Sequence, residues 1–326
     1  MSLCLLKKVI DLFMYMGSSS YIIKILLSRK KKKRGQFYYF PFSLFLFNKI
    51  RYSIAVHVID FHIHIGLKEH WHEWVHAYQK SSQSEFYKRY EELIVPEKFA
   101  QYLKDNDIAK AVILPDLCPI TTGIVPNEYV MEFCKGQDIF APFCTINPSF
   151  TTHPGLEAKK FIQMGAKGIK LYPSYNHFYP NENRMYPVYD LAQEEQLPVL
   201  VHTGSSVFKG SKIKYADPIH LDEVATDFPD LILLMAHGGR GIWYDRAFFL
   251  SRIHANLFVE ISGLPPKKLL DYFPDMENNI DKFVYGSDWP AIQTISSNID
   301  AIKNLPLKED SKKKILYGNA AKILGL

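Results

Sequence analysis

The feature that most constrains the fold of this chain is an alternation of short apolar runs with helical segments, repeated along residues 55–326. The apolar runs have the length of buried strands, and the segments between them carry helix signals such as an early proline or a following glycine. We therefore expect eight strand–helix units, with strands at residues 56–65, 109–115, 139–146, 167–173, 198–202, 231–237, 257–261 and 283–287.

Eight such units predict an α/β fold, a (β/α)8 TIM barrel, which typically needs about 250 residues. An open doubly wound sheet is the alternative, but it requires a glycine-rich phosphate turn after the first strand, and the residues after Gly66 do not form one. Residues 67–89 instead predict an inserted loop and helix region after strand 1. We expect the histidines of this insertion to belong to a lid or pocket wall rather than to a metal site.

Residues 1–54 differ sharply in charge from the rest of the chain. They hold eleven Lys or Arg against the single acid Asp11, a balance of +10, so the net charge of +5 leaves −5 for residues 55–326. The basic run at residues 29–34 is compatible with a nuclear-localisation, membrane or nucleic-acid patch, but a solvated basic tail is the interpretation we favour. We predict a poorly ordered N-terminal extension over residues 1–54, outside a catalytic domain at residues 55–326.

The composition places the chain among ordinary globular proteins, with 47% hydrophobic and 22% charged residues. The longest apolar run of the extension, residues 37–47, is well below the ~20 residues that span a bilayer, and the order of charged and apolar segments does not match a secretory signal. Four cysteines without a CxxC spacing predict reduced thiols: Cys4, Cys118, Cys134 and Cys144. We expect a cytoplasmic protein, a possible homo-oligomer, with neither a membrane nor a nucleic acid as partner.

Polar side chains stand where the predicted strands end. In the first strand, alternation places Asp60, His62 and His64 on one face, just before Gly66. Further polar residues end later strands or follow them: Lys170, His202, His237 and Asp288. Because the carboxyl ends of all barrel strands converge on one mouth, these residues predict a metal site there. Asp60 is either a partner that orients an imidazole or a plain strand-end residue.

The order His-x-His, His, His and Asp, with Gly-Ile-Lys-Leu-Tyr-Pro at residues 168–173, resembles the amidohydrolase superfamily. The resemblance covers residues 56–326 and is strongest to the amidohydrolase-2 branch of metal-dependent TIM-barrel hydrolases and decarboxylases. It implies that His62, His64, His202 and Asp288 bind a metal. It also implies that His237 binds a second metal or, in one-metal members, is catalytic.

These residue types suit a divalent metal, with zinc expected and manganese or iron possible. Asp288 and His237 are the expected catalytic residues: Asp288 would move the proton of an activated water, and His237 would steady the oxyanion or the hydroxide. Lys170 leaves the metal count open. A carboxylated Lys170 would bridge two metals, whereas a free amine, which we favour, implies one metal per chain.

The predicted partner is a small-molecule substrate, and a carboxylate-bearing one is compatible with the sequence. The residues expected to bind it are Lys170, Tyr172, His177, Arg240 and Trp289. A metal-dependent hydrolase acting on a small amide, ester or lactone is the expected function. The alternative is a metal-dependent non-oxidative decarboxylase (carboxy-lyase) of an aromatic or unsaturated acid.

Overall fold

The computed structural model describes residues 57–81, 85–292 and 294–326. The predicted extension, residues 1–54, lies outside the described residues, and so does Cys4. Cys118, Cys134 and Cys144 are buried free thiols.

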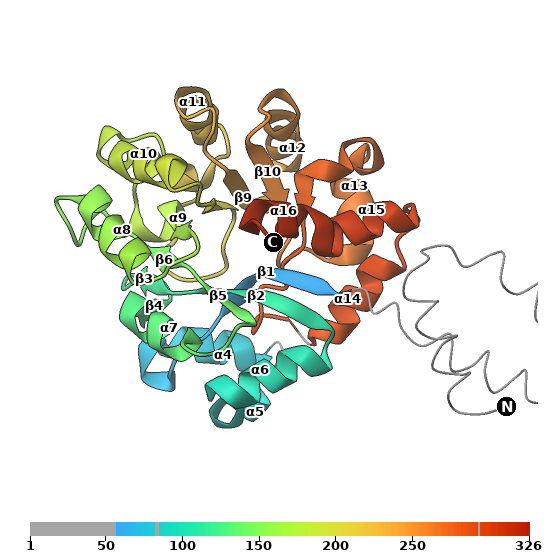
Figure 1. Cartoon of the computed structure of the whole chain (residues 1–326), viewed down its shortest axis with the longest axis horizontal. Coiled ribbons are helices and arrows are strands. Elements are labelled where there is room, and N and C mark those ends of the chain that lie inside the picture. The colour runs from blue at the N-terminus through green and yellow to red at the C-terminus, as the bar shows by residue number, and fades with distance from the viewer. Residues whose placement is uncertain (1–56, 82–84, 293) are drawn as a thin grey trace, which may run out of the picture. The chain divides into compact units, whose positions relative to one another are not determined.

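Parallel strands form a ring in the described part of the chain (Figure 1). They pair in the orders β1-β2-β5 and β6-β7-β8-β9-β10-β11. The bounds of the ring strands are β1 Val58–His64, β2 Ile108–Leu114, β5 Phe140–Pro142, β6 Cys144–Thr145, β7 Ile169–Leu171, β8 Val199–Gly204, β9 Leu233–Arg240, β10 Leu257–Glu260 and β11 Phe283–Val284.

Two junctions complete the ring. β5 and β6 continue one another across Phe143, whose N–H donates to the carbonyl of Ile113 on β2 (2.9 Å). β11 joins β1 through backbone bonds from Phe61 to Tyr285 (3.1 Å) and from His64 to Trp289 (2.8 Å). With β5 and β6 counted as one, the described residues form an eight-stranded barrel, which confirms the predicted fold.

Helices cover the outside of the ring, between successive strands. Their bounds are α6 Pro96–Asp105, α7 Asn127–Cys134, α8 Pro154–Gln163, α9 Pro173–Asn176, α10 Tyr186–Glu194, α11 His220–Asp227, α12 Tyr244–Ile253, α13 Leu269–Tyr272, α14 Ile295–Lys303, α15 Glu309–Lys313 and α16 Asn319–Leu324, with a π-helical turn η6 at Lys314–Gly318. Single-turn 3-10 helices are η1 Lys68–His70, η2 Asn183–Met185, η3 Ile213–Ala216 and η4 Pro266–Lys268, and a longer one is η5 Met276–Lys282. No helix among the described residues is both long and apolar enough to cross a bilayer.

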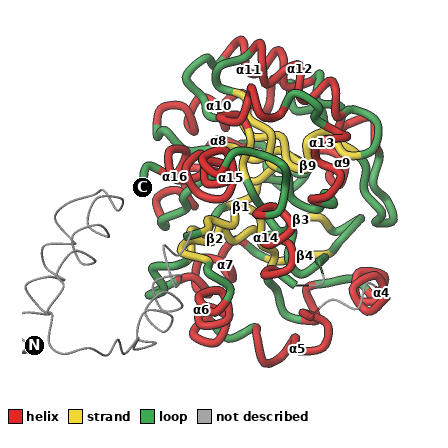
Figure 2. Tube along the Cα trace, turned by 90° about the vertical axis from the view of Figure 1, so that its right-hand side faces the viewer, coloured by secondary structure: helices red, strands yellow, loops and turns green. Residues whose placement is uncertain are grey.

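The barrel interior is apolar at the end opposite the strand carboxyl termini. Ile59, Phe61 and Phe143 lie there, and the rings of Phe61 and Phe143 meet edge to face at 5.7 Å. Ala320, Ala321 and Ile323 of α16 pack into the same cluster. Figure 1 shows α16 across the middle of the ring, and Figure 2 shows it at the end opposite α4 and α9. The helix therefore closes the base of the barrel.

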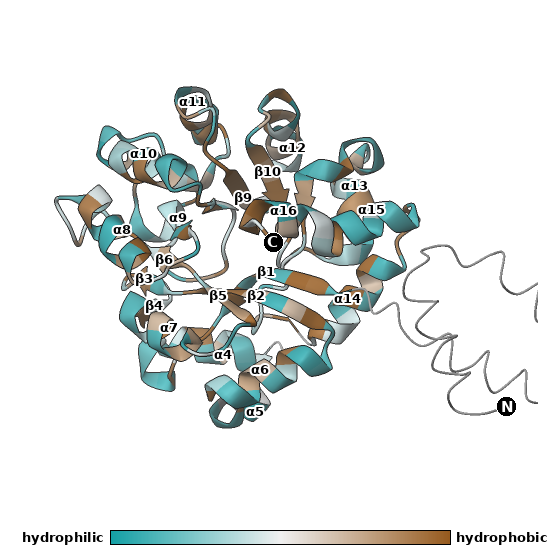
Figure 3. Cartoon of the chain, in the orientation of Figure 1, coloured by the Kyte–Doolittle hydropathy of each residue, from teal (hydrophilic) through white to brown (hydrophobic). Residues whose placement is uncertain are grey.

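A second apolar cluster joins the barrel to its helices. Figure 3 shows the helices as apolar toward the strands and largely hydrophilic outside. Amphipathic helices of this kind gain most of their stability from burying one face.

β1 does not keep the strict alternation expected from its sequence. Ile59 and Phe61 lie in the interior cluster, whereas Ile63 and Ile65 belong to the outer one. The pairing of β1 with β2 is irregular between Asp60 and Ile63, and an irregularity of this type re-aims the side chains that follow. The prediction that Asp60 shares one regular face with the two histidines was therefore wrong.

The insertion after β1 contains α4 Glu73–Ser81 and α5 Glu85–Leu93, as the sequence predicted. A hairpin that the sequence analysis did not predict, β3 Asp116–Cys118 with β4 Gly123–Val125, lies against it. The N–H of Trp74 on α4 donates to the carbonyl of Thr121 in the hairpin turn (2.6 Å). Insertion and hairpin together wall one side of the barrel mouth.

Candidate functional site

A cavity of about 270 Å³ opens at the carboxyl ends of the strands. Six residues carry its polar chemistry, and they come from five different strand ends: His62, His64, Lys170, His202, His237 and Asp288. Aromatic side chains form much of the remaining wall: Trp71, Tyr78, Tyr172, Tyr175 and Phe208. The structure thus brings residues separated by more than 200 positions to one point.

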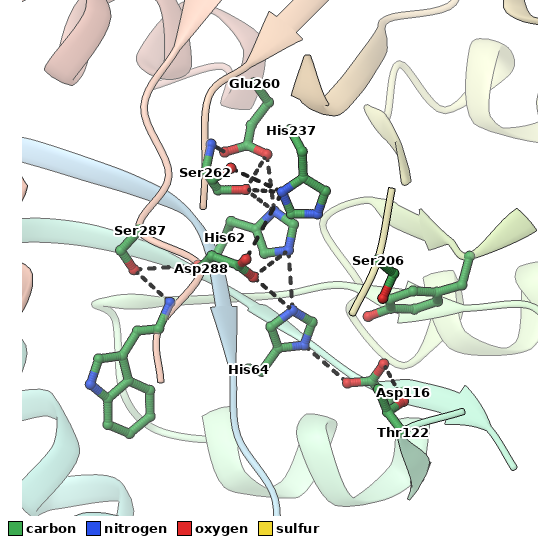
Figure 4. A network of polar contacts seen from close by, with 12 residues as sticks. His62, His64, Asp116, Thr122, Ser206, His237, Glu260, Ser262, Ser287 and Asp288 are labelled. Atoms are coloured by element: carbon green, nitrogen blue, oxygen red, sulfur yellow. Dashed lines mark hydrogen bonds and ion pairs between the residues drawn. The ribbon is translucent and has the colours of Figure 1, made fainter. Parts of the chain in front are cut away.

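The tightest group in this cavity consists of His62, His64 and Asp288 (Figure 4). One ligand atom from each lies within 4.8 Å of the others. The Nε2 atoms of His62 and His64 are 3.1 Å apart, and each is 3.6 Å from Asp288 Oδ1. Three potential metal ligands therefore point at one small space.

Both imidazoles are held from behind by carboxylates. His62 Nδ1 lies 3.0 Å from Glu260 Oε2, and His64 Nδ1 lies 3.0 Å from Asp116 Oδ2. A histidine that donates its Nδ1 proton to a carboxylate keeps a lone pair on Nε2, which is the usual arrangement behind a metal ligand. Each ring therefore presents an acceptor atom to the space that it shares with Asp288.

This arrangement fits a cation. Two imidazole lone pairs and a carboxylate oxygen repel one another at these distances unless a positive charge lies between them. Burial opposes protonation of His64, but the charge of Asp116 and hydrogen bonds with Asp116 and Asp288 outweigh it and raise the pKa of His64 to about 9. Imidazole and carboxylate donors are those that zinc and similar divalent metals accept.

Hydrogen bonds to its backbone join the segment that carries Asp288 to β1. The N–H of Asp288 donates to the carbonyl of His62 (3.0 Å), and Asp60 Oδ1 accepts the N–H groups of His62 (3.1 Å) and Ser287 (2.8 Å). Asp60 therefore binds backbone and does not orient an imidazole, which settles the choice that the sequence left open. Burial raises the pKa of Asp60 to about 7.

Asp288 and His237 both have left-handed backbones, each with φ of 64°. Non-glycine residues rarely adopt this conformation, and such strain concentrates at functional sites. Although burial opposes ionisation, the neighbouring imidazoles hold the pKa of Asp288 well below its usual range. Burial holds the pKa of His237 well below its usual value, so its ring is neutral.

His202 faces the cavity but does not belong to the tight group of His62, His64 and Asp288. Its ring centroid is 4.8 Å from that of His237, and burial holds its pKa well below the usual value. Its buried Nε2 is without a hydrogen-bond partner among the described residues. An orphaned acceptor of this kind suits a metal or a substrate donor in the cavity.

Lys170 and Arg240 supply the positive charge of the cavity wall. Lys170 is fully buried and its Nζ has no hydrogen-bond partner within the described ranges, while burial lowers its pKa to about 8. Arg240 donates from Nε and Nη2 to the carbonyl of Ser205 (3.1 and 3.0 Å), and its Nη1 lies 3.7 Å from Asp288 Oδ2. One edge of the guanidinium is thus occupied, and only the other faces the site.

Three further residues were predicted to bind substrate. Tyr172 lines the cavity, with its hydroxyl donating to the carbonyl of Pro115 (2.7 Å). His177 does not line it: its Nε2 lies 2.7 Å from the carbonyl of Gly210, and its ring stacks on Tyr215. Trp289 is fully buried against Phe99, with ring centroids 4.8 Å apart. The structure therefore corrects the predictions for His177 and Trp289, which a substrate in this cavity does not reach.

Sequence reasoning missed three residues that support the site: Asp116, Glu260 and Ser262. Each follows or ends a barrel strand, so the rule that found His202 and His237 offered a signal for them as well. The signal was weak because an isolated acid or serine at a strand end is common on ordinary surfaces.

Comparison with solved structures shows the same fold in other proteins. An uncharacterized TIM-barrel protein from Bordetella bronchiseptica is 23% identical, with a TM-score of 0.68, covering 82% of this chain and 98% of that one. 5-Carboxyvanillate decarboxylase from Sphingomonas paucimobilis is 14% identical (TM-score 0.60; 83% and 99% covered). A probable 2-pyrone-4,6-dicarboxylic acid hydrolase from Acinetobacter baumannii is 16% identical (TM-score 0.59; 83% and 100% covered).

A comparison with curated proteins gave no match. The profile of the amidohydrolase family Amidohydro_2 matches residues 59–326, which span the whole barrel. The sequence motifs, the barrel and this match agree, and the chain belongs to the amidohydrolase family.

Proposed function

We propose that this protein is a hydrolase that uses one divalent metal, of the zinc type, to cleave a small amide, ester or lactone. The observation that carries the proposal is the convergence of His62 Nε2, His64 Nε2 and Asp288 Oδ1 on one space beside an open cavity. His62, His64 and Asp288 would hold the metal, with His202 as the fourth ligand on the cavity side. A divalent metal bound there supplies Lewis acidity for attack by water on an acyl group.

The two oxygens of Asp288 support a division of labour. Oδ1 faces the imidazoles of His62 and His64, whereas Oδ2 lies toward Arg240 (3.7 Å) and His237 (4.0 Å from Nδ1). Oδ2 is therefore the atom placed to take a proton from the attacking water and return it to the leaving group. Arg240 favours the ionised carboxylate between these two transfers.

His237 is arranged to hold the water rather than the oxyanion. Its Nδ1 lies 2.9 Å from the carbonyl of Ser262, an atom that only accepts, so Nδ1 carries the ring proton. The Nε2 atom of the neutral ring is then an acceptor. Of the two roles that the sequence left open, steadying the attacking hydroxide is the one that an acceptor can perform, because a hydroxide can donate its O–H and an oxyanion cannot.

The charge of the wall favours a substrate with an acidic group. Lys170 and the open edge of Arg240 both face the cavity. Glu260, Asp288 and Asp116 act on the charge of Lys170, yet its Nζ has no hydrogen-bond partner among the described residues and could donate to an anion. Because a carboxylated Lys170 would be needed to bridge two metals, one metal per chain is proposed together with an uncarboxylated Lys170. Tyr172 and Tyr175, whose rings stack 5.7 Å apart, form a flat wall suited to a ring or conjugated chain.

Non-oxidative decarboxylation of an aromatic or unsaturated acid is the second candidate. The observation that favours it is Lys170, a buried cation whose free Nζ could hold a carboxylate or deliver a proton to carbon. The likeness to 5-carboxyvanillate decarboxylase, at 14% identity, supports the shared fold and leaves the choice of reaction to experiment.

One experiment separates the candidates. The purified protein is analysed for metal and then offered carboxylate-bearing lactones, esters, amides and aromatic acids in H2¹⁸O and, separately, in D2O. Hydrolysis places ¹⁸O in the product carboxylate without release of CO2, whereas decarboxylation releases CO2 and places deuterium on carbon. Protein that binds no divalent metal, or turnover unchanged in Asp288→Asn, would contradict both candidates.

A further inference from the structure

A buried cluster that the proposed reaction does not use directly lies behind His62 and His237. It consists of Glu260, the last residue of β10, and Ser262, both fully buried. They contact His62, from β1, and His237, from β9 (Figure 4). A group that touches a proposed metal ligand and the proposed water-holding residue at once can act on both.

The hydrogen bonds within the cluster are closed on themselves. Glu260 Oε1 accepts the backbone N–H of Ser262 (2.8 Å), and Glu260 Oε2 accepts the Ser262 hydroxyl (2.8 Å). A hydroxyl has one proton and two lone pairs, so Ser262 Oγ, having donated to Glu260, can only accept from its other neighbours. Glu260 therefore fixes the direction of the serine hydroxyl.

Two imidazole nitrogens face that hydroxyl oxygen. His62 Nδ1 lies 2.9 Å and His237 Nδ1 lies 3.0 Å from Ser262 Oγ. His62 Nδ1 is also 3.0 Å from Glu260 Oε2, and His237 Nδ1 is 2.9 Å from the Ser262 carbonyl. With Glu260 ionised, each of these neighbours is an acceptor, so both rings carry their proton on Nδ1 and present an Nε2 lone pair on the far side of the ring.

The space for this cluster is provided by Gly286, which follows β11. A Cβ at that position would collide with Glu260 Oε1 and with His62 Cβ. A strand-end glycine commonly marks such a close approach. The ends of β1, β10 and β11 thus meet where the Glu260 carboxylate contacts the His62 imidazole.

We propose that Glu260 and Ser262 form a single positioning unit that sets the tautomer and orientation of both His62 and His237. The inference deepens the proposed function and rests on it only for the roles of the two histidines. Asp116 provides the natural contrast, because it holds His64 alone and touches neither of the other rings. Loss of the Glu260–Ser262 unit should disturb two functional residues, and loss of Asp116 only one.

His62, His237 and Glu260 also satisfy the distance criterion for a second metal site, with ligand atoms within 4.8 Å of one another. The Ser262 hydroxyl occupies the point where such an ion would lie, at 2.8–3.0 Å from all three residues. The positioning role and a second-metal role therefore make different predictions for the number of metals bound.

The first test uses the metal-free wild-type protein. Long-range ¹H–¹⁵N correlation of ¹⁵N-histidine-labelled protein, assigned with His62→Asn and His237→Asn, is expected to show both rings as neutral Nδ1–H tautomers. A proton on Nε2 of either ring would overturn the proposal. This measurement does not depend on metal or turnover, so it remains decisive even if the proposed function fails.

The second test compares Glu260→Gln and Ser262→Ala with Asp116→Asn. We expect Glu260→Gln and Asp116→Asn each to weaken zinc binding about 10–100-fold in a chelator competition, the usual effect of losing the group behind a ligand. Only Glu260→Gln and Ser262→Ala should also shift the ¹⁵N signals of His237, with zinc stoichiometry unchanged. Ser262→Ala, which leaves no charge unpaired, carries the test if Glu260→Gln does not fold.

Two results would refute the positioning role. His237 signals that respond equally to Asp116→Asn would remove the special status of the unit. Wild-type protein that binds two zinc ions, one of them lost in Glu260→Gln, would make Glu260 a metal ligand. Wild-type protein that binds no zinc would instead contradict the proposed function while leaving the tautomer result to decide the inference.

Discussion

The two halves of the barrel interior are built on opposite principles. At the base, Ile59, Phe61 and Phe143 pack with the residues of α16 into an apolar plug. At the mouth, the same strands bury His62, Lys170 and Glu260, whose polar groups cost free energy to bring out of water. The base of the ring thus stabilises the fold. Its mouth, only a few residues further along the strands, buries polar and charged side chains, two of them on left-handed backbones.

Asp288→Asn tests the mouth of the barrel and should have the largest effect on activity. Loss of the carboxylate removes a proposed metal ligand and the proton-transfer atom, so kcat/KM should fall about 10³-fold or more. Thermal unfolding followed by circular dichroism should show little loss of stability. A variant that retains more than about a tenth of wild-type kcat/KM would contradict the role given to Asp288.

Phe61→Ala tests the base of the barrel, where we expect a loss of stability. Phe61 is fully buried and packs edge to face on Phe143, so its truncation should lower the free energy of unfolding by about 3–5 kcal/mol. Chemical denaturation measures this loss. The folded variant should still bind metal with wild-type affinity, and a parallel loss of metal affinity would show that the two halves are not separable.

The pH dependence of substrate binding should report the buried charge of Lys170 at the mouth. Burial lowers the pKa of Lys170 to about 8, so its ammonium is present below that pH and lost above it. For a carboxylate-bearing substrate, KM should rise about tenfold per pH unit above pH 8. Lys170→Met should show a high KM without this rise, and an uncharged substrate should show no rise with either protein.

His202→Leu should have a small effect on stability, and one opposite in sign to that of Phe61→Ala. Its buried Nε2 lacks a partner among the described residues, so an apolar side chain of similar size should raise the free energy of unfolding of the metal-free protein by about 1 kcal/mol. Activity should fall nevertheless. A stability loss above about 1 kcal/mol would show that His202 contributes to packing at the mouth.

The barrel itself could be predicted from sequence because apolar runs alternate with helix signals along residues 55–326. Each predicted strand corresponds to one in the structure, with shifts of a few residues at the ends. The hairpin Asp116–Cys118 with Gly123–Val125 escaped prediction because its strands are three residues long and lack an apolar alternation. Its antiparallel pairing depends on packing against the insertion.

The residues that meet at the barrel mouth could be predicted from the sequence, but the residues behind them could not. His62, His64, His237 and Asp288 stand out as a set, because several histidines and an acid recur at or just after the ends of different apolar strands. Glu260 and Asp116 carry the same signal, but their importance depends on which ring each faces, and that is set by the tertiary structure. Trp289 shows the converse, since it neighbours Asp288 in sequence while its ring packs in the core.

The junction between β1 and β11 has a consequence for how the protein is made. Asp60 grips the backbone of Ser287 from 227 positions away, and the first strand can close the ring only through the last. A nascent chain that has emerged only as far as α13 holds the imidazoles of His62 and His64 but lacks Asp288, which completes their pocket. Binding of the proposed metal should therefore be a late event in biosynthesis, because it requires that β11 and Asp288 have left the ribosome.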